Sequence, residues 1–168
     1  GRLLIALDDF INPKTGKRGM YASNSEDISE YKESFEVDWL PGMGSIFHSM
    51  VYEKLGPLDD IGFPQYHGDA DYTYRAKSEG FTITVYPELV IYNDKSNSSL
   101  THDNTWKSFF RSLNSIRSNY DIKKDLLFYR KYARSPFAWF NLLEKYFIYF
   151  GSFIKWKFLG MFGIKRKT

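Results

Sequence analysis

His67-Gly-Asp-Ala-Asp-Tyr-Thr-Tyr-Arg-Ala-Lys-Ser-Glu-Gly80 is the stretch that decides the predicted fold. It places two carboxylates, Asp69 and Asp71, directly before a run of helix-compatible residues. Either carboxylate is placed to cap a helix, because the free backbone N–H groups and the dipole at a helix start favour negative charge. A glycine is typical of a helix end. We therefore expect a helix that begins at this Asp-x-Asp and ends at Gly80.

The two carboxylates have more than one possible use. If one caps the helix, the other is free to face a cleft as a general base for a sugar hydroxyl or as a ligand for a hard cation. Alternatively, both only cap and charge the first turn, which is the commoner use of so short a motif. Arg75 follows Asp71 by four residues, the spacing of a local ion pair on one helix face.

Short strands and helices are predicted on both sides of this segment. Apolar or alternating residues favour strands at 3–7, 35–40, 45–48, 81–86 and 89–92. A helix is predicted over about Met50 to Leu55, and polar composition predicts loops at 19–34 and 93–101.

Beyond residue 102 the pattern becomes helical, because aromatic and aliphatic residues recur at three- and four-residue steps from Trp106 to Ile116. Two or three helices are expected between residues 103 and 162. The predicted organisation is a small α/β part over residues 1–102, followed by a helical, aromatic-rich and basic extension over residues 103–168.

Composition limits the possible classes of protein. Hydrophobic residues at 43% and charged residues at 26% are typical of a folded domain. The absence of cysteine excludes disulfides, thiolate metal sites and a cysteine nucleophile, and it fits a cytoplasmic location. A net charge of +3 does not favour a nucleic-acid partner. The chain begins without Met in an apolar run typical of the middle of a strand, so we expect it to be part of a longer protein.

Three segments in order resemble the second half of the family 2 glycosyltransferases, most closely their bacterial rhamnosyltransferase-like members. They are Asp38-Trp-Leu-Pro-Gly42, then Asp69-Ala-Asp-Tyr-Thr-Tyr-Arg75 with Gly80, then Tyr86-Pro87 with Val90-Ile-Tyr92. Several motifs in the right order are more specific than one, and the resemblance covers roughly residues 1 to 100. It implies the acceptor-side, C-terminal half of a GT-A (nucleotide-diphospho-sugar transferase) fold. The implied activity is inverting transfer of a sugar from a nucleotide-sugar donor to a polysaccharide or lipid-linked acceptor.

The resemblance also implies roles for individual residues. Asp69 matches the general base, which would deprotonate the acceptor hydroxyl as it attacks the anomeric carbon. Arg75 matches a residue that supports the helix and the preceding loop. The implied substrate-binding residues are Asp38, Trp39, Gly42, Met43, Gly44 and Asp71, of which Asp71 is expected to be mainly structural. Trp39 would wall the acceptor pocket or, alternatively, pack in the core.

The chain departs from the family pattern at two positions. Gly68 replaces the acidic residue that usually precedes the base, and Asn93-Asp94 stands where many members have a histidine. Amide and carboxylate oxygens suit Mg²⁺ or Mn²⁺, so Asn93 and Asp94 are weak candidate metal ligands. The donor-binding βαβ half, with its own metal-binding Asp-x-Asp, has no counterpart here. The complete enzyme is therefore expected to use a divalent cation, and this chain alone is expected to be inactive.

The extension is rich in aromatic residues and ends in Lys165, Arg166 and Lys167. Aromatic helices with basic ends suit the headgroup boundary of a membrane, so residues 137–168 predict peripheral contact with the inner face of the plasma membrane. Packing on the rest of a longer protein or on a partner subunit, including an oligomer, is the alternative. Two alternatives to the transferase stay open. One is a non-catalytic carbohydrate-binding or membrane-interaction module, and the other is an unrelated fold in which the Asp-x-Asp is only a helix cap.

Overall fold

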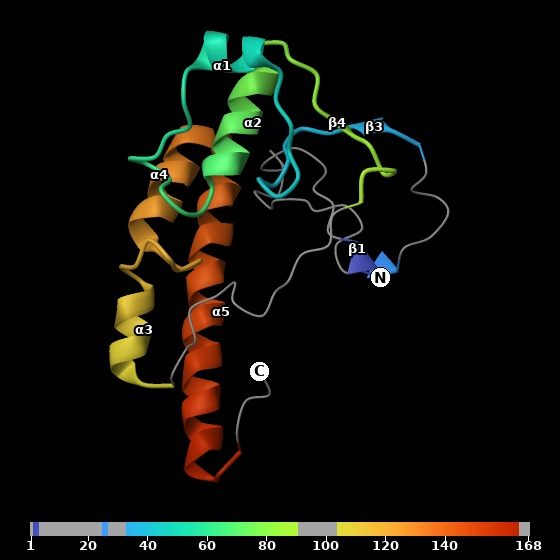
Figure 1. Cartoon of the computed structure of the whole chain (residues 1–168). Coiled ribbons are helices and arrows are strands. Elements are labelled where there is room, and N and C mark those ends of the chain that lie inside the picture. Colours follow the sequence, from blue (N-terminus) through green and yellow to red (C-terminus); the bar gives the residue numbers. More distant parts are fainter. Residues whose placement is uncertain (1, 4–24, 27–32, 91–103, 165–168) are drawn as a thin grey trace.

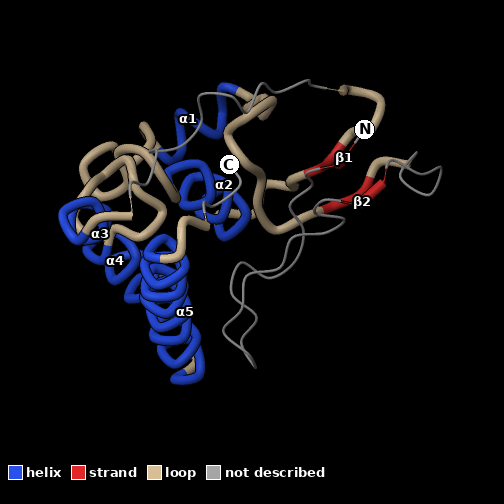
Figure 2. The backbone as a smooth tube through the Cα atoms, turned by 90° about the horizontal axis from the view of Figure 1, so that it is seen from below, coloured by secondary structure: helices blue, strands red, loops and turns tan. Residues whose placement is uncertain are grey.

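The computed structural model describes residues 2–3, 25–26, 33–90 and 104–164, and helices dominate this part of the chain (Figure 1). The helices are α1 (Ser49–Leu55), α2 (Gly68–Ser78), α3 (Trp106–Ser112), α4 (Ile122–Tyr132) and α5 (Pro136–Met161). The described strands form two antiparallel pairs: β1 (Arg2–Leu3) with β2 (Ser25–Glu26), and β3 (Phe35–Glu36) with β4 (Thr84–Val85). The helices gather on one side and the strand pairs on the other (Figure 2). At a coarse level the architecture is α/β.

The helices expected after residue 102 are confirmed, and each begins at a side chain that caps it. Thr105 accepts a hydrogen bond from the N–H of Ser108 at the start of α3, and Asp121 accepts one from Lys124 at the start of α4. Ser135 caps α5, where proline follows in the first turn. These caps satisfy N–H groups that have no partner within the helix. The predicted helix over about 50–55 is confirmed as α1.

Helix α2 ends where the sequence predicts but begins differently. Its last residue is Ser78, and Gly80 has the positive φ of 89° that favours glycine. The predicted cap by Asp69 or Asp71 is wrong: the N-cap is His67, which has a left-handed φ of 71° and makes no side-chain cap hydrogen bond. Both carboxylates lie inside the first turn.

The strands are shorter than predicted. The prediction of a strand at 45–48 is wrong, because this segment forms no strand and Ile46 is 87% exposed. His48 instead caps α1: its Nδ1 accepts a hydrogen bond from the N–H of Met50 at 3.2 Å. The strands expected at 35–40 and 81–86 are reduced to β3 and β4, although a hydrogen bond from Val37 N–H to Ile83 O continues their pairing at 2.9 Å. A strand with one partner is hard to lengthen, since isolated two-stranded pairs are marginal.

Four other predictions fall partly or wholly outside the described residues. Of the strand expected at 3–7, only its first residue is described, in β1. Residues 89–90 of the strand expected at 89–92 lie in an exposed, non-strand segment, and 91–92 are outside the described part. The loop expected at 19–34 contains β2, and the loop expected at 93–101 lies entirely outside the described residues.

The larger hydrophobic core joins the two predicted parts of the chain. Its buried residues are Trp39, Phe63, Ala70, Phe128, Tyr129, Ala138 and Leu142. Trp39, Phe63 and Ala70 come from the segment before residue 102, and the other four come from α4 and α5. A second cluster of Val51, Tyr72 and Ala76 packs α1 against the opposite face of α2. Helix α2 therefore lies between α1 and α4.

Candidate functional site

The segment from Asp38 to Gly44 lies along α2, so the first two motifs of the resemblance are in contact. The N–H of Leu40 donates to Thr73 Oγ1 at 3.2 Å, and the N–H of Gly42 donates to Asp69 Oδ2 at 2.8 Å. At the other end of the segment, the ammonium group of Lys77 binds the carboxylate of Asp38. These contacts, made by Asp69, Thr73 and Lys77, hold the loop before α1 along the length of α2.

Asp69 is half-buried, and both of its carboxylate oxygens accept backbone N–H groups. Oδ2 accepts from Gly42, and Oδ1 accepts from Ala70 at 2.8 Å. The loop approaches closely: a Cβ on Gly42 would lie 3.4 Å from Asp69 Cβ and 3.7 Å from Oδ2. In the described part of the chain no ion pair involves Asp69. Its charge is therefore stabilised by neutral backbone N–H donors, and each carboxylate oxygen keeps a lone pair for a further hydrogen bond.

Asp71 has a different environment, because its side chain is completely buried. Arg75 Nε donates to Oδ2 at 2.9 Å, and Lys131 Nζ and the Tyr132 hydroxyl of α4 donate to Oδ1. The local Asp71–Arg75 pair predicted from four-residue spacing is confirmed. Burial, together with the hydrogen bond to Asp71, raises the pKa of the Tyr132 hydroxyl well above its usual value. Asp71 thus joins α2 to α4 and faces the interior.

The structure contains a second fully buried carboxylate, Asp125 of α4, which sequence reasoning missed. His67 Nε2 lies 2.9 Å from its Oδ1, and Oδ2 accepts hydrogen bonds from Lys145 Nζ and from the Tyr146 hydroxyl, the latter at 2.8 Å. Burial alone raises the pKa of this carboxyl, but the hydrogen bond from His67 and the charge and hydrogen bond of Lys145 outweigh it and lower the pKa to about 2. The only signal in the sequence is its three-residue spacing from Phe128, which places both on the inner face of α4.

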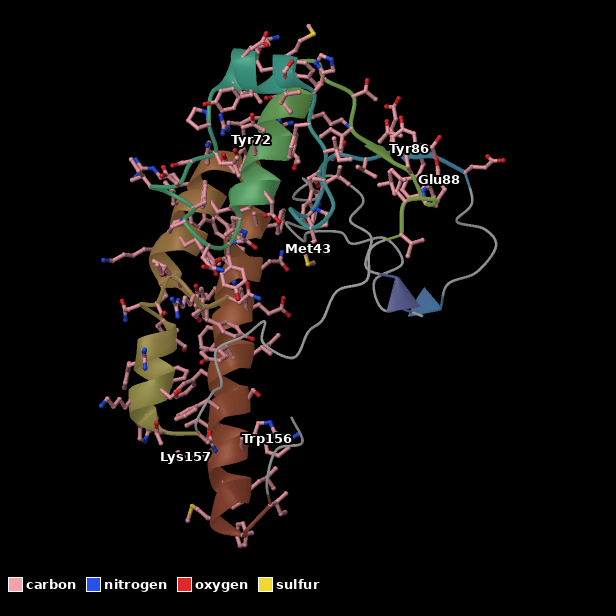
Figure 3. All side chains as sticks on the ribbon, in the orientation of Figure 1. Met43, Tyr72, Tyr86, Glu88, Trp156 and Lys157 are labelled. Carbon is pink, nitrogen blue, oxygen red and sulfur yellow. The ribbon has the colours of Figure 1, made fainter. Side chains whose placement is uncertain are left out.

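The remaining residues predicted for the site differ in how far they are buried. Trp39 is 8% exposed and belongs to the larger core, the alternative allowed for it from the sequence. Met43, labelled in Figure 3, is 52% exposed on the loop that contacts Asp69, and Gly44 on the same loop has φ 78°. Gly68, the departure from the family pattern, is buried, and a Cβ there would lie 2.9 Å from the carbonyl oxygen of Phe63. An acidic side chain therefore does not fit at residue 68 without a backbone shift.

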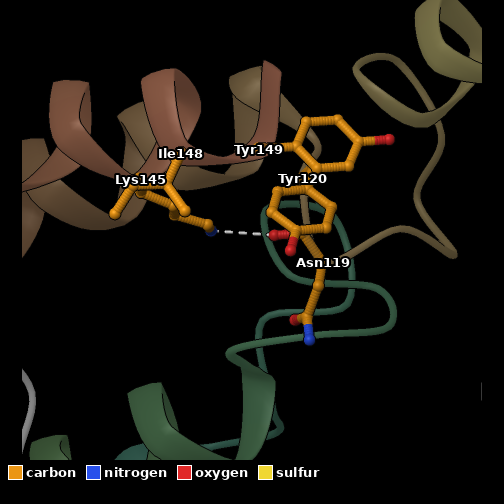
Figure 4. A pocket seen from close by; sticks show the side chains of 5 residues that line it. All are labelled: Asn119, Tyr120, Lys145, Ile148 and Tyr149. Atoms are coloured by element: carbon orange, nitrogen blue, oxygen red, sulfur yellow. Dashed lines mark hydrogen bonds between the residues drawn. The ribbon is translucent and has the colours of Figure 1, made fainter. Parts of the chain in front are cut away.

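A pocket of about 300 Å³ lies against α5, on elements other than those that carry Asp69 (Figure 4). It is lined by Asn119, Tyr120, Lys145, Ile148 and Tyr149. The rings of Tyr120 and Tyr149 stack at 3.7 Å, and Lys145 Nζ donates to the carbonyl oxygen of Asn119 at 2.8 Å. Because Lys145 also binds Asp125, its charge is compensated within the protein.

The candidate metal ligands Asn93 and Asp94 lie outside the described residues. Within the described ranges, no group of three or more acidic or histidine side chains is arranged to hold a metal ion. Nor does any helix in these ranges combine the length and the apolar character needed to cross a membrane. Comparison of the chain with protein-family models, with curated proteins and with solved structures returned no match.

Proposed function

We propose that this chain is the acceptor-side half of an inverting GT-A glycosyltransferase, in which Asp69 is the general base. The observation that carries the proposal is the contact between the carboxylate of Asp69 and the backbone of Gly42. It brings together the first two of the three segments on which the family resemblance rests. It also fixes a partly exposed carboxylate beside a glycine-containing loop, where a sugar can approach the backbone closely.

The reaction requires one proton transfer at Asp69. The acceptor hydroxyl donates a hydrogen bond to a free lone pair of the carboxylate, and its oxygen attacks the anomeric carbon of the donor. The bond from that carbon to the nucleoside diphosphate breaks, and the diphosphate leaves with the electron pair. Asp69 takes the hydroxyl proton. Direct displacement inverts the anomeric centre, and a positioned base contributes about 10²- to 10⁴-fold to the rate.

The contrast with Asp71 supports this choice of base. Asp71 forms ion pairs with Lys131 and Arg75, and both pairs would be broken if it took the proton of the acceptor hydroxyl. Asp69 is held by neutral N–H groups, so it can accept a proton without breaking an ion pair. We therefore assign the chemical role to Asp69 and a structural role to Asp71.

In this proposal the binding site for the donor belongs to a βαβ unit elsewhere in a longer protein. The proposed donor is a nucleotide sugar, and the acceptor is a polysaccharide or a lipid-linked glycan. Mg²⁺ or Mn²⁺, when bound, would neutralise the donor diphosphate. The described residues include no group of three ligands for it, and the candidate ligands Asn93 and Asp94 lie outside them.

The test uses the full-length gene product with a nucleotide-sugar donor and a membrane-derived glycan acceptor. Asp69→Asn should lower kcat at least 100-fold while donor and acceptor affinities change less than threefold. Asp59→Asn is the matched control, because Asp59 Oδ1 also accepts the N–H of a glycine, Gly62, at 2.7 Å. The control should keep its activity.

Two results would count against the proposal. Transfer that persists in Asp69→Asn would remove Asp69 as the base. A wild-type protein that binds glycan but transfers no sugar from any nucleotide donor would favour the carbohydrate-binding module instead.

A further inference from the structure

More than half of the residues of α5 are exposed. A helix of 26 residues is about 39 Å long, yet only Ala138, Leu142 and Phe153 are buried. The inner face contacts α4 through Tyr146 and Asp125, and α3 through the Phe153 and Phe109 rings at 4.6 Å. Figure 1 shows α3 and α4 on one side of α5, and Figure 2 shows α5 projecting from the other helices.

An outward face of α5 carries a continuous row of apolar side chains, which we call the apolar stripe; Phe150, at its edge, also contacts the Phe109 ring of α3 at 5.7 Å. Its members are Phe140, Leu143, Phe147, Phe150, Ile154, Phe158 and Met161, spaced by three or four residues. Each is between 40% and 78% exposed. The stripe runs for about 32 Å along the helix and contains no charged residue. Apolar patches of this extent on a protein surface mark an interaction site.

The charges beside the stripe indicate what covers it. Lys155 and Lys157 lie on its two sides by helical geometry, and no acidic residue occurs in the sequence after Glu144. The sequence then adds three more basic residues at 165–167. A second copy of the chain would bring the same cations and no acidic partner on this part of the helix. An anionic lipid surface supplies both an apolar layer for the stripe and phosphates for the lysines.

We propose that α5 lies in the plane of an anionic membrane surface, with the apolar stripe buried at the boundary between headgroups and acyl chains. Lys155 then reaches the lipid phosphates by extending its side chain outward. Lys157 Nζ lies over the Trp106 and Phe153 rings, at 5.7 and 6.0 Å from their centroids. Helices α3 and α4, on the other side of α5, stay in water. The inference does not depend on Asp69 or on sugar transfer, so either can fail without the other.

The test is co-sedimentation of the full chain with vesicles of phosphatidylcholine alone and of phosphatidylcholine with phosphatidylglycerol. We expect at least tenfold stronger partitioning to the anionic vesicles. Phe147→Glu with Ile154→Glu should weaken that partitioning at least tenfold, since it places two acidic groups in the stripe. Ile61→Glu with Ile46→Glu is the matched control, because these residues are 93% and 87% exposed outside α5. The control should change partitioning less than twofold.

A separate substitution tests the electrostatic part. Lys155→Gln should weaken binding to anionic vesicles about fivefold and leave binding to neutral vesicles unchanged. Circular dichroism should show the same helix content and melting temperature for all variants, because the altered side chains are exposed.

Three outcomes would overturn the proposal. The first is a wild-type chain that does not sediment with anionic vesicles. The second is a stripe variant that sediments like the wild type. The third is a lipid-free dimer, measured by light scattering, that the stripe variant converts to a monomer while neither binds vesicles. That result would assign the stripe to a second copy.

Discussion

The buried carboxylate of Asp125 should make the stability of the chain depend on pH in a defined range. Its pKa falls from the ordinary 3.8 to about 2 in the folded protein. A shift of this size corresponds to about 2 kcal/mol of stability, since each pKa unit is worth about 1.4 kcal/mol. The conversion is appropriate because the side chain is completely buried.

The sign follows from the direction of the shift. The folded state binds a proton at Asp125 more weakly than the unfolded state, so ionised Asp125 stabilises the fold. This contribution is complete above about pH 5 and is lost as the pH falls through the unfolded value of 3.8 towards the folded value of about 2.

The assay compares urea unfolding of the wild type and Asp125→Asn by tryptophan fluorescence at several values between pH 2.5 and pH 7. At pH 7 the variant should be less stable by at least about 2 kcal/mol, because His67 and Lys145 lose their anionic partner. The difference should shrink as the pH falls through the unfolded value of 3.8, because the unfolded wild type then takes up a proton at Asp125 more readily than the folded protein does. Asp60→Asn is the control, because Asp60 is exposed and should shift stability by less than about 0.5 kcal/mol.

A difference between Asp125→Asn and the wild type that stays constant from pH 7 to pH 2.5 would refute this reasoning. A variant more stable than the wild type at pH 7 would do the same. It would mean that the cost of burying the carboxylate exceeds the contribution of its three partners.

Three further predictions concern α2 and α5, and all are measured as free energies of unfolding in urea. Asp71→Asn should destabilise the chain by about 1 to 3 kcal/mol, a range limited because Lys131 is 37% exposed and can be hydrated when it loses its partner. Gly68→Ala should destabilise it by about 1 to 3 kcal/mol, since the added Cβ meets the Phe63 carbonyl at 2.9 Å. Gly151→Ala is the paired test in the middle of α5, where a Cβ meets nothing within 4 Å, and it should stabilise the chain by about 0.5 to 1 kcal/mol.

The helices could be predicted because their signals are local. The end of α2 next to a glycine depends on residues within one turn of the boundary. The periodic spacing of aromatic residues was sufficient to predict helices after residue 102. The exposed apolar face of α5 was also visible as an excess of aromatic residues, although the sequence did not show which of them are buried.

The start of α2 and the buried clusters could not be predicted, because they depend on partners distant in sequence. Asp69 does not cap the helix because Gly42, 27 residues earlier, supplies an N–H to its carboxylate. Asp71 does not cap it because Lys131 and Tyr132 bind it from α4. The strand expected at 45–48 failed for a related reason: β-forming side chains need a neighbouring strand, and His48 instead caps α1.

The geometry of Asp69 depends on contacts made by its neighbours on α2. In the first turn of α2, Asp71 binds Lys131 of α4. His67, the residue before α2, binds Asp125, which also belongs to α4. Arg75 then donates to the carbonyl oxygens of Leu55 and Pro57 at the end of α1. These contacts fix both the axial position and the rotation of α2.

Because the rotation of a helix determines where each side chain points, the same contacts direct Asp69 towards Gly42. The two buried carboxylates each accept from a lysine and a tyrosine hydroxyl, whereas Asp69 accepts from neutral backbone groups. Compensated charges therefore hold the helix in place and leave one uncompensated carboxylate at the loop. That separation is what a proton-accepting site requires, since a group that anchors the fold cannot also change its charge during a reaction without loosening it.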